Sequence, residues 1–129
     1  FANNAGIAGH VTVGNNVTIG ALTTIHQFCQ MGDFSFAGMN ASITMDVPSY
    51  IKVASNPARV VGLNSVGMER GGVDQEIITI LKKAYKIIYR KGFNLKDAIE
   101  KVESMESSGV QEVRNFVDSI KSSERGILR

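Results

Sequence analysis

The sequence predicts a left-handed parallel β-helix followed by a small C-terminal helical domain, a fold that is mainly β with added α structure. Three observations predict it. An apolar residue recurs every six positions over residues 1–48, and the apolar spacing becomes helical after residue 73. All 14 Lys and Arg residues follow residue 49, whereas residues 1–49 contain only two charged residues, both acidic. We therefore expect the last coils of a β-helix over residues 1–49, a connecting segment over 50–73 and a helical domain over 74–129.

The six-residue repeat predicts the shape of each coil. In blocks of six the start reads FANNAG IAGHVT VGNNVT IGALTT IHQFCQ MGDFSF AGMNAS ITMDVP, and the first position is apolar in every block. An α-helix cannot use this period, because six residues are not a whole number of helical turns and successive block leaders would point in three directions. If each block is one short strand and a corner, three blocks form one triangular coil. We expect the first and fifth positions to point inward and the small second positions to form the corners.

The number of coils predicts that this chain is part of something longer. Eight blocks make only about 2.7 coils, and a solenoid needs about three repeats and capped ends. Phe1 is already in register, with no capping segment before it. We expect the chain to be the C-terminal portion of a longer protein, and the alternative is a naturally short β-helix domain.

Residues 74–129 show the spacing of three amphipathic helices. Asp74 is the expected N-cap of the first, which Gly92 ends, and its apolar stripe comprises Ile77, Ile80, Leu81, Ala84, Ile87 and Ile88. Asn94 is the expected N-cap of the second helix, with Asp97 three residues on. The third covers residues 110–120. Three short helices after a solenoid suit a cap over its open last coil.

Composition excludes several classes of protein and site. With 43% hydrophobic and 20% charged residues the chain is not a disordered tail. It has neither a long apolar run nor a signal peptide, so we expect a cytoplasmic protein without membrane insertion. One cysteine and two histidines are too few for a multi-cysteine zinc site or the three-histidine site of hexapeptide carbonic anhydrases, so no metal or cofactor is expected. Cys29, at an inward fifth position, is expected to be a buried apolar residue rather than a nucleophile.

Four segments carry a family resemblance, namely AGHVTVGNNVTIG, TIHQFCQMGD, AYKIIYRKG and the closing RGILR. They resemble the C-terminal half of the acyl-[acyl-carrier-protein]–UDP-N-acetylglucosamine O-acyltransferases, which open lipid A biosynthesis, and the similarity spans essentially all 129 residues. The resemblance implies a homotrimer with active sites in clefts between neighbouring β-helices. It also implies transfer of a 3-hydroxyacyl group from acyl carrier protein to the 3-hydroxyl of UDP-N-acetylglucosamine.

The resemblance implies roles for residues along one edge of the coils. The family's general base is a histidine upstream of the segment that matches Phe1, so this chain alone is expected to be inactive. The backbone N–H of Gly9 is the expected oxyanion donor, and His10, His26 and Gln27 are expected along the cleft. Coil arithmetic also places His10 and His26 on successive coils of the same edge. The alternative is that each histidine only forms hydrogen bonds across a trimer interface.

Asn64 and Arg70 match family residues that contact the nucleotide, since an amide suits the uracil edge and a guanidinium suits phosphate. The family commonly has a Glu and a second Arg where this sequence has Val66 and Gly71, which puts uridine and diphosphate recognition in question. The alternative is that Asn64 and Arg70 form the cap of a short helix.

One column of the repeat bears on acyl-chain length. Asn3, Ala21 and Met39 are each three blocks apart and therefore stack, and in the family the positions of Ala21 and Met39 face the acyl groove. A small residue at the latter position admits a long chain, whereas methionine fills that space. We expect a shorter acyl chain than long-chain members use. The alternative is that Met39 packs against a neighbouring subunit.

The first predicted helix is basic, with Lys82, Lys83, Lys86, Arg90 and Lys91. Carrier proteins are acidic, so this face is expected to steer acyl carrier protein toward the site. A plain solvated face is the alternative. Nucleic acid is not an expected partner, because no nucleic-acid-binding motif accompanies the charge.

Two other functions stay open on the sequence. One is a non-catalytic hexapeptide-repeat trimer that binds a carrier protein or a nucleotide. The other is the related UDP-3-O-acylglucosamine N-acyltransferase, whose resemblance does not extend to the HQFC and RGILR segments. The sequence does not distinguish a hydroxyl acceptor from an amino acceptor.

Overall fold

The computed structural model describes residues 5–129, so Phe1 and Asn3 of the repeat lie outside the described residues. Seven two-residue strands come first: β1 (Gly6–Ile7), β2 (Thr12–Val13), β3 (Thr18–Ile19), β4 (Thr24–Ile25), β5 (Gln30–Met31), β6 (Phe36–Ala37) and β7 (Ser42–Ile43). Two longer strands follow, β8 (Ile51–Ala54) and β9 (Arg59–Leu63). The helices are α1 (Ser65–Arg70), α2 (Gln75–Tyr89), α3 (Leu95–Glu103), the 3₁₀ helix η1 (Glu106–Gly109) and α4 (Gln111–Lys121).

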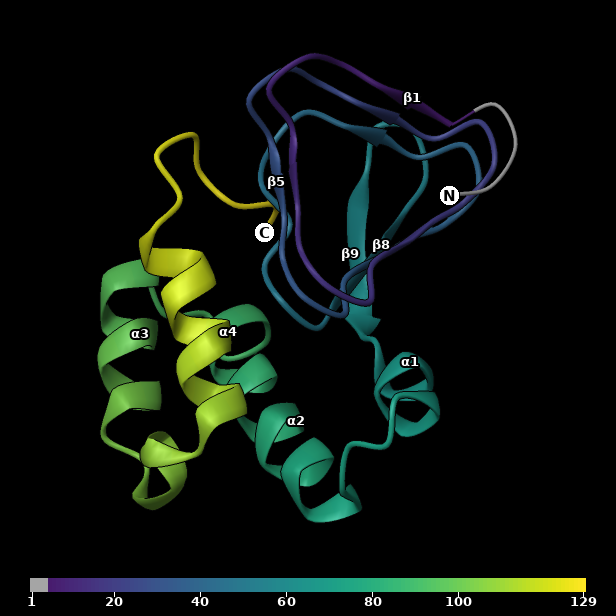
Figure 1. Cartoon of the computed structure of the whole chain (residues 1–129). Coiled ribbons are helices and arrows are strands. Elements are labelled where there is room, and N and C mark those ends of the chain that lie inside the picture. Colours follow the sequence, from purple (N-terminus) through teal and green to yellow (C-terminus); the bar gives the residue numbers. More distant parts are fainter. Residues whose placement is uncertain (1–4) are drawn as a thin grey trace.

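The strands stack into a left-handed parallel β-helix with the predicted period. Gly6 pairs with Thr24 and Thr24 pairs with Ser42, so each turn of the coil takes three six-residue blocks on this face. The same register joins β2 to β5 and β3 to β6. Figure 1 shows the coils as nested triangles, with β1, β5 and β8 on different sides.

The predicted inward positions are confirmed. From the second coil on, the first and fifth residues of each block are at most 2% exposed, as Ile25, Cys29 and Met31 illustrate. Burial raises the pKa of the Cys29 thiol, which fits an apolar interior residue. In the first described coil Ile7 is 36% exposed.

The prediction that the second positions form the corners is wrong. The corners lie at the fourth positions, where six non-glycine residues adopt φ between 57° and 67°: His10, Asn16, Leu22, Phe28, Phe34 and Asn40. The second positions are small for another reason, namely close stacking. A Cβ on Gly20 would lie 2.7 Å from the backbone nitrogen of Met39, and one on Gly32 would lie 2.7 Å from the Cα of Ser49.

The last coil is shorter than the repeat predicts. Met31 of β5 forms a bridge with Val47, and Phe36 of β6 pairs with Lys52 of β8, and both spacings fall two residues short of three full blocks. Strand β8 then pairs antiparallel with β9. The stack of strands therefore continues beyond residue 49 into residues 50–73, which the sequence predicts to be only a connecting segment. The six-residue period ends at Pro48, so it carries no signal for β8.

Extended segments supply the backbone hydrogen-bond partners at the end of the stack. On one face β9 covers β8, and on another Ser42 forms backbone hydrogen bonds with Ser55 and Ala58, both of 3.1 Å. On the third face the C-terminal tail pairs with Asp46, which donates to the carbonyl of Gly126 over 2.9 Å. Figure 1 shows the helices beside the triangles. Helix α4 also contacts the last coil, because the Ser119 hydroxyl accepts from the backbone of Ser49 over 3.0 Å and the Asn115 amide donates to the Tyr50 hydroxyl over 3.3 Å. The helical part therefore covers the end of the stack together with these extended segments.

Asp46 holds the C-terminal tail with its side chain as well. It is 2% exposed, and its two carboxylate oxygens accept hydrogen bonds from the backbone of Gln30 at 2.8 Å and from the Ser123 hydroxyl at 2.6 Å. The tail also contacts α2, because the Tyr89 hydroxyl donates to the carbonyl of Leu128 over 2.9 Å. The tail thereby joins the coils to the helices.

The helical part agrees with the prediction in outline and differs in three details. Asp74 and Asn94 are the N-caps of α2 and α3, and the Asn94 side chain accepts from the backbone of Asp97 over 2.8 Å. Helix α2 ends at Tyr89, before Gly92, and α1 is a helix that the periodicity does not predict. The buried face of α2 is wider than the expected stripe: Ile78 and Tyr85 are buried with the expected Leu81, Ala84 and Ile88. The other expected residues pack against the core while partly buried, namely Ile77, Ile80 and Ile87. Within residues 5–129 no helix is both long and apolar enough to cross a bilayer.

Close stacking makes Gly32 intolerant of a side chain, and Gly62 provides a matched control. We expect Gly32→Ala to lower the free energy of unfolding by roughly 3 kcal/mol, because the methyl group would overlap the backbone of Ser49. Gly62→Ala meets no atom within 4 Å and should change it by less than about 0.5 kcal/mol. Urea denaturation of both variants measures the difference. Equal stability of the two variants would refute close stacking as the reason for the glycine.

Candidate functional site

The coils present candidate groups at three separate corners. The His10 corner comprises residues 9–10 and 26–28, the Asn16 corner residues 15–16 and 33–34, and the Leu22 corner residues 21–22 and 39–40. Neighbouring corners are six residues apart along the chain with one strand between them, so each corner is a different vertex of the triangle. The predicted site residues divide among these corners.

The His10 corner brings together Gly9, His10, His26 and Gln27, all of them exposed. The imidazole of His10 stacks on the Phe28 ring of the next coil, with the ring centres 5.2 Å apart and an angle of 13° between the planes. The backbone of His26 is held in the stack, because its N–H donates to the carbonyl of Ile43 over 2.9 Å. His26 therefore stands on a fixed backbone, and both histidine side chains lie outside the coil.

Gly9 carries the predicted oxyanion donor. Its backbone N–H has no hydrogen-bond acceptor within residues 5–129, and no atom lies within 4 Å of where a Cβ would be. An exposed N–H without an internal acceptor can donate to a ligand. The role of Gly9 stays a prediction. Within the same described range no three His, Cys, Asp or Glu side chains cluster in a way that could hold a metal ion.

Ala21 and Met39 lie together at the Leu22 corner, away from the histidines. Asn40 donates to the carbonyl of Ala21 over 2.8 Å, which fixes the two coils against each other. Met39 is 71% exposed and Leu22 is 55% exposed, so this corner is an uncovered apolar edge. Asn3, the third member of the predicted column, lies outside the described residues.

A groove of about 550 Å³ lies at the Asn16 corner. One wall is the outward ladder of Thr18, Phe36 and Lys52, which occupy matching positions on β3, β6 and β8. The other wall is α1. The lining residues are Asn16, Val17, Thr18, Phe34, Phe36, Lys52, Asn64, Val66, Gly67, Arg70 and Gly71. The groove thus contains both predicted nucleotide residues, together with Lys52 and Phe36, which the sequence analysis does not single out.

Asn64 forms the joint between the two walls of this groove. It is 5% exposed, its Nδ2 donates to the carbonyl of Phe34 over 2.8 Å, and its Oδ1 accepts from the backbone of Gly67 over 3.1 Å. Asn64 is therefore the N-cap of α1, as the alternative interpretation predicts. Arg70 is not a cap. It is the last residue of α1, exposed, and it lines the groove.

The basic face of α2 is exposed. Lys82, Lys83, Lys86 and Arg90 all lie in solvent. Of the described residues only Lys121 and Glu103 form an ion pair, at 3.2 Å, so no carboxylate neutralises this face at short range. The charge is available to an acidic partner.

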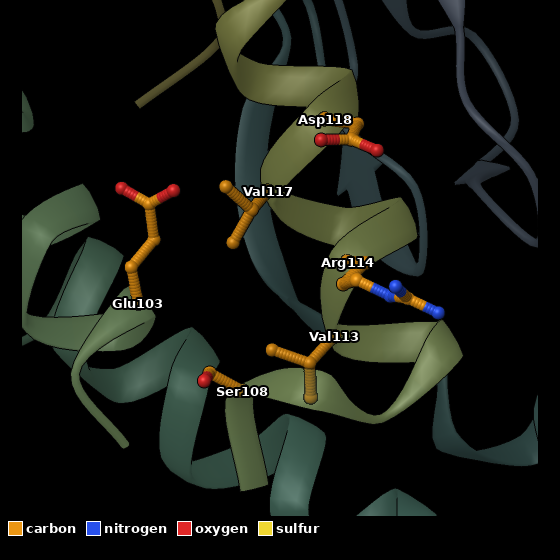
Figure 2. A pocket seen from close by; sticks show the side chains of 6 residues that line it. All are labelled: Glu103, Ser108, Val113, Arg114, Val117 and Asp118. Atoms are coloured by element: carbon orange, nitrogen blue, oxygen red, sulfur yellow. The ribbon is translucent and has the colours of Figure 1, made fainter. Parts of the chain in front are cut away.

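A smaller hollow of about 220 Å³ lies between α3, η1 and α4, and Figure 2 shows the residues that line it. Val113 and Val117 point toward Glu103 and Ser108 across the hollow, whereas Arg114 points away. No histidine or cysteine is among the six lining residues.

Comparison with known proteins points to one group of enzymes. A family profile described as UDP N-acetylglucosamine O-acyltransferase, domain 2, matches residues 46–128. The acyl-[acyl-carrier-protein]–UDP-N-acetylglucosamine O-acyltransferase of Stutzerimonas stutzeri (strain A1501) is 42% identical over 129 residues, covering 100% of this chain and 50% of the relative. The protein of that description from Anaeromyxobacter sp. (strain K) is 41% identical, with the same coverage. The chain spans about half the length of the curated relatives it matches.

Solved structures agree with this similarity. The UDP-N-acetylglucosamine O-acyltransferase of Moraxella catarrhalis RH4 superposes with a TM-score of 0.93 and 37% identity, over 99% of this chain and 49% of that one. The Arabidopsis UDP-N-acetylglucosamine acyltransferase superposes with a TM-score of 0.95 and 33% identity, over 100% of this chain and 48% of that one. The coils and the helical part match together.

Proposed function

The chain belongs to the family of UDP-N-acetylglucosamine O-acyltransferases, and on this premise we propose that the whole protein moves a 3-hydroxyacyl chain from acyl carrier protein to the 3-hydroxyl of UDP-N-acetylglucosamine. The observation that carries the proposal is the similarity over the full 129 residues, at 42% identity, to a relative named acyl-[acyl-carrier-protein]–UDP-N-acetylglucosamine O-acyltransferase. The histidine corner, the exposed apolar corner residues, the groove at the Asn16 corner and the basic face of α2 support it.

The His10 corner supplies part of the transfer chemistry in this proposal. The N–H of Gly9 donates to the oxyanion that develops on the thioester carbonyl, and His10, His26 and Gln27 orient the donor and the sugar. The general base that deprotonates the sugar hydroxyl is a histidine upstream of Phe1. The 129-residue chain alone is therefore inactive.

The functional protein is a homotrimer in this proposal. One chain carries its candidate groups at three different corners, namely the histidines, the acyl-groove residues and the nucleotide groove. A bound substrate contacts all three groups only when corners of neighbouring copies face each other. Exposed apolar side chains at two of these corners support such packing, since Leu22, Phe28 and Met39 are 55%, 58% and 71% exposed.

The groove at the Asn16 corner holds the nucleotide. Arg70 offers its exposed guanidinium to a phosphate. Asn64 caps α1 and also uses its second amide N–H and second acceptor position at the uracil edge. Val66 and Gly71, which also line the groove, offer neither a carboxylate nor a second guanidinium.

An assay of the whole protein tests the proposed reaction. With a 3-hydroxyacyl carrier protein and UDP-N-acetylglucosamine, we expect an ester at the 3-hydroxyl. Transfer only to an amino sugar would replace the proposal with N-acyl transfer. Binding of both substrates without any product would replace it with a non-catalytic scaffold.

Met39 is expected to limit the length of the acyl chain. In an acyl-chain series we expect the whole protein to prefer a short 3-hydroxyacyl chain, and Met39→Gly to shift the preference toward longer chains by about tenfold in relative kcat/KM, because it removes the side chain at the Leu22 corner. Undiminished preference for the longest chain, unaffected by Met39→Gly, would contradict this role.

The basic face of α2 is expected to bind acyl carrier protein. Reversing Lys82, Lys83 and Lys86 to Glu should raise the KM for the acyl carrier protein by at least about tenfold, and added salt should raise the wild-type KM. The KM for UDP-N-acetylglucosamine should not change. Lys96→Glu on α3, also exposed, is the control. Carrier kinetics that do not respond to the triple reversal would leave α2 as a plain solvated face.

A further inference from the structure

We infer that Lys52 is a second cationic residue of the nucleotide groove and contacts the diphosphate together with Arg70. The inference rests on the proposed function, because it assumes that the groove at the Asn16 corner takes a nucleoside diphosphate. It makes Lys52 one of the residues that recognise the diphosphate of the substrate.

The groove is built to attract an anion. Lys52 on β8 and Arg70 on α1 line opposite walls, and none of the eleven lining residues is acidic. Neither cation forms an ion pair within the described part of the chain. A nucleoside diphosphate carries at least two negative charges, so one guanidinium leaves part of that charge without a partner.

The side chain of Lys52 is held in place before any ligand binds. It is half-buried on the outer face of β8, and its Nζ lies 5.2 Å from the centre of the Phe36 ring on the neighbouring strand. A cation over an aromatic face is attracted to it, and contact along the stem limits the rotamers that the side chain can adopt. The ammonium thus starts in the groove, at a lower entropic cost than a free surface lysine.

The shortened last coil is what puts Lys52 there. Phe36 pairs with Lys52 because this coil lacks two residues of the repeat, whereas a coil of three full blocks would place Ala54 opposite Phe36. The same shortened coil carries the chain through β9 into α1, which brings the Arg70 wall over Phe34 through the Asn64 hydrogen bond. Both cations therefore depend on one local departure from the repeat.

Calorimetric titration of the whole protein with UDP and with uridine tests the inference. Lys52→Met keeps the apolar stem over Phe36 and removes the charge. We expect it to weaken UDP binding by about tenfold and to leave uridine binding within about twofold, while Lys52→Arg restores UDP binding to within about threefold. The dependence of UDP affinity on salt should fall in Lys52→Met, because one fewer cation takes part.

Lys101→Met is the matched control. The Lys101 Nζ lies 4.6 Å from the centre of the Phe93 ring, so it makes the same kind of contact outside the groove, and its loss should change neither affinity. Wild-type UDP affinity in Lys52→Met, or equal weakening of UDP and uridine, would overturn the inference, as would a wild-type protein that does not bind UDP.

Failure of the proposed function looks different. A whole protein that binds UDP through Lys52 and transfers no acyl group would refute the acyltransferase and leave the inference standing. A protein that transfers the acyl group with a KM for UDP-N-acetylglucosamine and a UDP affinity unchanged by Lys52→Met would refute the inference alone.

Discussion

The hydrogen bonds between successive coils, at a fixed spacing of three six-residue blocks, are the constraint on which the rest of the structure depends. They bring residues three blocks apart into register on every face of the regular coils, as Gly6, Thr24 and Ser42 show. Because the spacing is constant, each corner carries a column of side chains that cannot move to another corner. The histidines, the exposed methionine and the nucleotide groove are therefore kept apart within one chain.

The regular stack of parallel coils ends where the spacing between paired residues becomes two residues shorter. Ile43 still pairs in the regular register, whereas Val47 bridges Met31 and Lys52 pairs with Phe36 two residues early. The strands of this last turn need new partners, and β9, the turn at Ser55 and the C-terminal tail supply them. The buried Asp46 carboxylate binds the tail, and the tail binds α2. The closure of the β-helix thus holds the helices and the wall of the groove in place.

The sequence predicted the regular coils better than the segments that follow the repeat. Eight blocks with one period were enough to predict the coils, their inward residues and the stacking of His10 with the coil of His26. The same pattern assigned the small second positions to the corners, because a glycine for bending and a glycine for close stacking look alike in sequence. The position of Lys52 beside Phe36 could not be predicted, because no periodicity in the sequence reveals that one coil is shorter than the others. Helix α1 is too short to show a periodic signal. The sequence therefore did not decide whether Asn64 caps a helix or contacts a ligand, and the hydrogen bonds of Asn64 to Phe34 and Gly67 show that it is the cap.

In the proposed function a complete site takes corners from two copies of the chain, and mixing inactive copies tests this most directly. His26→Ala disables the His10 corner, and Arg70→Gln disables the Asn16 corner. When the two whole-length variants are co-expressed in equal amounts and purified together, random assembly predicts about a quarter of wild-type acyl transfer, from sites that combine one intact corner of each kind. Mixed assemblies that are no more active than either variant alone would show that each site is built within a single chain.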